Sequence, residues 1–186
     1  MRADSLESVV MKTVFATLLI AAHLCAQSTA TQSAPPKNPL VATSQAFFAS
    51  AKNNILRSAD KVPDDLWSYQ PAPTVRTFAQ LFAHVADGQY EFCGMASEGK
   101  VVDKGIEKSA TTKAAIVAAL KDAFAYCEAA YAKMTDTTAA EMVPFFNRQV
   151  TRIGAMDYNV VHTTEHYGNL VTYMRLKNIV PPTSRQ

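Results

Sequence analysis

The sequence has few residues that break regular structure and no pattern that predicts strands. Its 186 residues contain 6 glycines, and the apolar content is ordinary, which together exclude a disordered chain. No stretch alternates apolar and polar side chains as a half-buried strand does. Lysines and arginines are scattered and do not interleave with aromatic residues, so we expect no nucleic-acid binding. The length suits one domain with its own core.

Several metal and cofactor motifs are also missing. We find no His-Glu-x-x-His motif, no Glu-x-x-His pair of a di-iron bundle and no Cys-x-x-Cys-His haem site. The letters HTTEH at 162–166 do spell the peptidase motif His-x-x-Glu-His, which needs a further carboxylate ligand downstream. Glu165 is the only acidic residue from His162 to the end of the chain. We therefore reject the peptidase interpretation.

Residues 1–28 predict an N-terminal extension followed by a secretory signal peptide. From about Met11, a lysine precedes an apolar run at 14–24 that is too short to span a membrane. We expect a secreted or periplasmic protein whose mature chain has no transmembrane segment. Lipoprotein anchoring at Cys25 is the alternative, against which the bulky Leu24 argues.

Four amphipathic blocks predict an all-α fold, a four-helix bundle. A flexible, polar leader at 29–38 precedes the predicted domain at 39–182, and a short tail at 183–186 follows it. The expected helices cover about residues 40–59, 74–96, 111–134 and 151–178.

The connection between the second and third helices bears on the topology. It is about a dozen residues long, and at ~3.3 Å per residue it can run the length of a bundle ~30 Å tall. A parallel pair, and hence up-down-down-up order, fits this length, although an antiparallel pair with a long loop stays open. Cys93 and Cys127 lie at similar depths in these two helices. A parallel pair would let them form a disulfide, whereas an antiparallel pair would leave two separate buried thiols.

Three of the four histidines are candidate metal ligands, because His23 falls within the signal peptide. His162 and His166 are four residues apart and share a helix face. If the second and fourth helices are antiparallel, His84 lies at the same level, ~15–18 Å from their common end. Gly88, one turn from His84, leaves room for a ligand or a close helix. Three imidazoles and an open coordination position form a catalytic-type site for a divalent metal, while ordinary core histidines are the alternative.

Two stretches carry a resemblance to a known family. "VPDDLWSYQPAPTVRTFAQLFAHVAD" resembles the loop and metal-histidine helix of the DinB-like family, and "VVHTTEHYGNLVTYMRLKNIVPP" resembles its last helix with an HxxxH pair. The resemblance implies an up-down-down-up bundle that holds zinc or nickel through His84, His162 and His166. It also implies homodimers, and relatives that include thiol-dependent transferases and isomerases.

We therefore predict a secreted, metal-binding protein that is a metal-dependent hydrolase or transferase of an unknown small-molecule substrate. Glu91, Asn159 and Glu165 are candidates for a base or for residues that support the metal ligands. The alternatives are a non-catalytic bundle in which metal stabilises the fold or an interaction surface, and a plain helical domain without metal.

Overall fold

The computed structural model describes residues 35–184. The predicted extension and signal peptide (1–28), including Cys25, and most of the predicted leader (29–38) lie outside the described residues, so export stays a prediction. Within residues 35–184, no helix is both long and apolar enough to cross a membrane.

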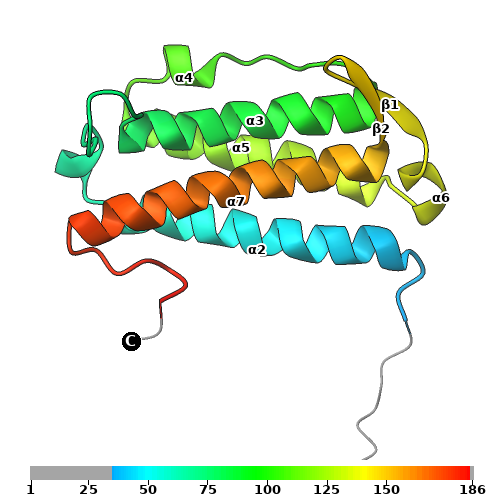
Figure 1. Cartoon of the computed structure of the whole chain (residues 1–186), viewed down its shortest axis with the longest axis horizontal. Helices are drawn as coiled ribbons and strands as arrows, with labels where there is room; N and C mark the ends of the chain where they lie inside the picture. The colour runs from blue at the N-terminus through cyan, green and yellow to red at the C-terminus, as the bar shows by residue number, and fades with distance from the viewer. Residues whose placement is uncertain (1–34, 185–186) are drawn as a thin grey trace, which may run out of the picture. The chain divides into compact units, whose positions relative to one another are not determined.

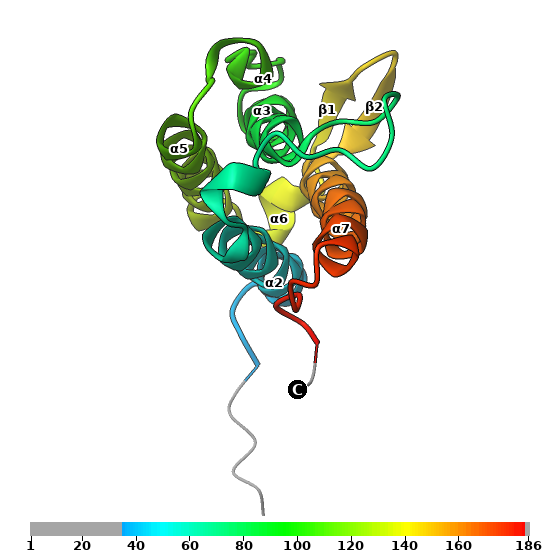
Figure 2. The same ribbon diagram turned by 90° about the vertical axis from the view of Figure 1, so that its left-hand side faces the viewer.

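Four long helices form the fold, as the sequence predicts (Figure 1). Seen end-on, they occupy the corners of a square in which α2 and α3 are diagonally opposite (Figure 2). The packed pairs are α3 with α5, α3 with α7, α2 with α7 and α2 with α5. The bounds are α2 (Pro39–Lys61), α3 (Phe78–Glu98), α5 (Lys113–Ala132) and α7 (Arg152–Leu176).

The order is up-down-down-up. Figure 1 shows α3 and α5 running in the same direction, opposite to α2 and α7. The connection between α3 and α5 contains the short helix α4 (Ile106–Ser109) and returns along the bundle. Cys93 and Cys127 form a disulfide with 5.4 Å between their Cα atoms. The question that the sequence left open is therefore answered in favour of the parallel pair and the disulfide.

Side-chain caps fix where the long helices begin. Thr77 and Gln80 form a capping box at the start of α3, so this helix begins at Phe78 rather than near residue 74. Thr112 caps α5 by accepting a hydrogen bond from the backbone N–H of Ala115.

The segment before α7 corrects the prediction that the chain has no strands. β1 (Met142–Phe145) and β2 (Arg148–Thr151) form an antiparallel hairpin. Val143 and Phe145 are buried on alternate positions of β1, but four residues are too short a run for a periodic signal. The short helix α6 (Asp136–Ala139) was also not predicted.

Candidate metal centre

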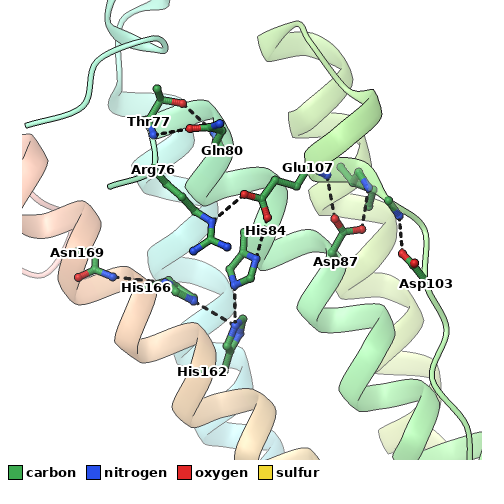
Figure 3. Close-up of polar contacts among 12 residues, drawn as sticks. Arg76, Thr77, Gln80, His84, Asp87, Asp103, Glu107, His162, His166 and Asn169 are labelled. Carbon is green, nitrogen blue, oxygen red and sulfur yellow. Dashed lines mark hydrogen bonds and ion pairs between the residues drawn. The ribbon is translucent and has the colours of Figure 1, made fainter. Parts of the chain in front are cut away.

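The three candidate histidines meet between α3 and α7 (Figure 3). Nε2 of His162 lies 3.2 Å from Nε2 of His84 and 3.1 Å from Nε2 of His166. The donor atoms of all three residues lie within 4.8 Å of one another. The three histidines thus meet as the sequence predicts, although α3 begins at Phe78 and His84 lies closer to the start of its helix than predicted.

Gly88 makes the close approach of α3 and α7 feasible at this level. A Cβ atom at Gly88 would lie 2.7 Å from Cε1 and 3.0 Å from Nδ1 of His162. Real Cβ atoms essentially never make contacts as short as the first of these. The glycine therefore provides the space that the His162 imidazole occupies.

Glu107 orients the first histidine. Nδ1 of His84 donates to Oε2 of Glu107 over 3.0 Å, and because a carboxylate only accepts, the proton must be on Nδ1. In the neutral imidazole this places the lone pair of His84 on Nε2, which lies 3.2 Å from Nε2 of His162. An acceptor on the outer nitrogen is the usual support of a metal-ligating histidine. Arg76 holds the other oxygen of Glu107, with Nε donating to Oε1 over 2.7 Å.

The position of Glu107 depends in turn on Asp87. The two oxygens of Asp87 accept the backbone N–H groups of Ile106 and Glu107, each over 2.8 Å. Both N–H groups belong to the first turn of α4, where amides have no partner within the helix and a carboxylate is a favourable acceptor. Asp87 lies about one turn after His84 on α3. The same helix therefore carries the candidate ligand His84 and the residue that positions Glu107 beside it.

The outer nitrogens of the other two histidines have weaker support. Nδ2 of Asn169 lies 3.4 Å from Nδ1 of His166. Ligation through Nε2 would place the proton of His166 on Nδ1, so the Asn169 amide would then turn to present its oxygen. Nδ1 of His162 is buried and has no hydrogen-bond partner among the described residues.

The arrangement fits a divalent metal ion. Tetrahedral Zn–N bonds of ~2.0–2.1 Å place two ligand nitrogens about 3.3 Å apart, close to the two separations around Nε2 of His162. Without a cation, a single proton cannot form a full hydrogen bond in both contacts of His162 Nε2. In at least one of the two contacts, the lone pairs of two imidazole nitrogens would then face each other. A cation satisfies all three lone pairs, and imidazole nitrogen suits zinc, nickel, copper and iron.

Burial keeps the histidines of α7 neutral. Burial, with the neighbouring His166 and His84, lowers the pKa of His162 to about 3. Burial, with His84 as the next cause, lowers the pKa of His166 to about 4. Neutral imidazole is the form that binds metal, so protons compete weakly for these two ligands at neutral pH. Burial acts to raise the pKa of Glu107, but Arg76 and His84 outweigh this effect. The pKa is lowered as a result, which keeps the carboxyl ionised.

The three candidates for a base or a supporting residue form no hydrogen bond to the histidines in the described part of the chain. Asn159 is fully buried, and its Nδ2 donates to Oε1 of Gln89 over 2.7 Å, away from the histidines. Glu165 is exposed on α7. Burial raises the pKa of Glu91, and the nearby His84 partly offsets this. Sequence reasoning missed Glu107, because a glutamate in a long connection has no periodic partner that would reveal it.

A cleft of about 630 Å³ adjoins the cluster. His166, Glu107 and Arg76 form its wall on the side of the histidines. Most of its other side chains are uncharged and polar, or small and apolar, and come from the loop before α3 and from α3 and α7. They are Gln70, Pro73, Thr74, Val75, Gln80, Leu81, Asn169 and Tyr173.

Solved structures with the same fold support the architecture. A DinB-like protein from Bacillus subtilis is 23% identical with a TM-score of 0.63, over 80% of this chain and 99% of that one. A DinB-like protein from Bacillus cereus is 17% identical with a TM-score of 0.64, over 76% and 97% of the two chains. A mycothiol-dependent maleylpyruvate isomerase is 14% identical with a TM-score of 0.59, over 70% of this chain and 60% of that one. No curated protein matches the sequence significantly.

The family itself is established by sequence. The model of the DinB superfamily matches residues 48–170, which is well over half of the chain. This match contains all three histidines of the cluster and the supporting Glu107. The chain belongs to the DinB superfamily.

Proposed function

We propose that this protein is a metal-dependent hydrolase or transferase that acts outside the cytoplasm and uses zinc or nickel. The observation that carries the proposal is the convergence of three Nε2 atoms, from His84, His162 and His166, beside a cleft. Three protein ligands leave a position for water or substrate, which is typical of catalytic rather than structural sites.

The chain's own residues supply binding and orientation at this site. Glu107 fixes the tautomer of His84, and the gap at Gly88 admits His162. When bound, a divalent metal would polarise a substrate carbonyl or lower the pKa of a water molecule toward neutral. His166 lies in the wall of the cleft, so a substrate there would reach the open side of the centre.

The nucleophile distinguishes a hydrolase from a transferase. The maleylpyruvate isomerase with a similar fold is mycothiol-dependent, so a thiol is a reasonable co-substrate for a relative. Export would remove this protein from the low-molecular-weight thiols of the cytosol. We therefore favour water as the nucleophile, and hence hydrolysis.

Metal analysis of the purified full chain tests the proposal. We expect about one zinc or nickel ion per chain, and a melting temperature that rises with added metal in wild type but not in His84→Ala. Equal metal content and equal response in both proteins would refute the proposal. Cobalt substitution then tests for an exchangeable water, and a coordinatively closed site would favour the non-catalytic bundle.

Two further expectations concern location and assembly. Fractionation of the producing cells and N-terminal sequencing should find a processed chain outside the cytoplasm, whereas an intact cytosolic chain would contradict export. The homodimer implied by the family resemblance stays a prediction, which light scattering after size-exclusion chromatography would test.

A further inference from the structure

We propose that the cleft binds a small molecule with an anionic oxygen group, a carboxylate or a phosphate, and that Arg76 is the residue that recognises it. This inference rests on the proposed metal-dependent function, because it assigns a substrate class to the same site. It depends on the position and free donors of Arg76.

The guanidinium of Arg76 has hydrogen-bond donors that no described residue accepts. Its Nε donates to Glu107, and this is its only side-chain hydrogen bond to any of residues 35–184. The two terminal amino groups therefore have no protein partner in the described part of the chain. The side chain is 41% exposed, so these groups remain accessible. A guanidinium with both terminal amino groups free is suited to bidentate binding of a carboxylate or phosphate.

One hydrogen bond holds the guanidinium of Arg76, and another holds its backbone. Glu107 fixes Nε, and Tyr173 of α7 donates its hydroxyl to the backbone carbonyl of Arg76 over 3.1 Å. Figure 3 shows the terminal amino groups turned away from Glu107, on the side where His166 lies. Arg76 and His166 both line the cleft. A ligand there can contact the arginine while its other end faces the metal centre.

The charge of the site favours an anion. Among the described residues that line the cleft, Arg76 and Glu107 are the only charged side chains, and they form an ion pair. Neutral imidazoles around a divalent cation would leave about two positive charges at one end of the cleft. Glu91 and Glu165 do not line the cleft. An anionic substrate would thus be attracted to a loaded site, whereas a cationic one would be repelled.

The nearby helix N-terminus does not explain anion binding. The first amides of α3 are already used, because Phe78 N–H donates to Tyr69 and Ala79 N–H donates to Trp67. The next amide, of Gln80, donates to the Thr77 side chain. Arg76 is therefore the positively charged donor that remains for an incoming oxyanion among the described residues that line the cleft.

Calorimetric titration of the zinc-loaded full chain tests the assignment, with malonate, succinate, glutarate and inorganic phosphate as probes. We expect at least one of them to bind, and Arg76→Met to weaken it by about tenfold or more, because a charge-assisted hydrogen bond is lost. Arg57→Met removes an equal charge from an exposed position on α2 and should leave the affinity unchanged.

The variant Glu107→Gln distinguishes two roles of Arg76: recognition of the anion, and a purely structural ion pair with Glu107. It keeps the guanidinium charge but offers an acceptor to only one of Arg76 and His84, so at saturating zinc it should weaken anion binding less than Arg76→Met does. If Arg76 only braced Glu107, both variants would weaken binding alike. No binding of any probe, or equal binding by wild type and Arg76→Met, overturns the assignment while leaving the metal centre intact. Loss of zinc from wild type would instead refute the proposed function.

Discussion

The substitution Gly88→Ala tests whether the gap in α3 exists to admit a metal ligand. The new Cβ would lie 2.7 Å from Cε1 of His162, about 1 Å inside an ordinary carbon contact. The ring cannot retreat freely, because the Phe92 ring packs against it with 5.0 Å between centroids. A metal site tolerates changes of only about 0.2 Å in its ligand distances. The substitution should therefore displace His162 from the position that completes the cluster.

Two opposing effects set the change in stability. Alanine is favoured over glycine inside a helix by about 1 kcal/mol. Overpacking of a close helix contact costs about 1–3 kcal/mol. The metal-free variant should therefore be between unchanged and about 2 kcal/mol less stable than wild type. The affinity for metal should fall more clearly, by at least the ~10–100-fold that loss of a supporting residue causes.

Gly168→Ala on α7 is the matched control. Gly168 is exposed, and a Cβ there would meet no heavy atom within 4 Å. This variant should gain about 1 kcal/mol from helix propensity and keep the wild-type affinity for metal. Competition with a coloured zinc chelator measures affinity, and urea unfolding of the metal-free proteins measures stability. Wild-type zinc affinity in Gly88→Ala would refute the reasoning.

Three other substitutions or conditions have directional outcomes. Glu107→Ala should weaken zinc binding by ~10–100-fold in the same competition assay, since His84 loses its acceptor, while Glu98→Ala should not. Cys93→Ala/Cys127→Ala opens a link with a sequence separation of 34 and should lower the free energy of unfolding by about 4 kcal/mol in urea; a loss below ~1 kcal/mol would contradict this. For metal-free protein, the pKa values of His162 and His166, about 3 and about 4, lie below the unfolded value of 6.5. The unfolded chain then binds more protons, so stability should fall as pH drops from 6.5 toward 4. His162→Gln/His166→Gln should flatten that part of the profile.

The long helices and the shared face of His162 and His166 could be predicted because they depend on local periodicity. The spacing of His162 and His166 places them on one face whatever surrounds the helix. His84 needs one further assumption, that α3 and α7 are antiparallel, and the structure satisfies it. The Cys93–Cys127 disulfide could be stated only as a consequence of the parallel arrangement of α3 and α5, since spacing alone does not give connectivity.

The hairpin could not be predicted for a different reason. Strands of four residues complete only two periods of alternation, and Pro144 within β1 suggests a loop. Its stability comes from burial of Val143 and Phe145 against the rest of the protein, which is tertiary information. Arg76 and Glu107, which lie outside the four long helices, also take their places in the site through tertiary contacts.

The crossover between α3 and α5 does more than connect them. A parallel pair requires the chain to return along the bundle, as Figure 1 shows, and on the way Glu107 of the crossover contacts His84. There the carboxylate of Asp87 binds the first amides of α4, and this contact presents Glu107 to His84 and to Arg76. An antiparallel pair would need only a short loop at one end and would bring no carboxylate to this position. The topology therefore supplies both the support of a candidate metal ligand, His84, and the partner of the arginine that lines the cleft.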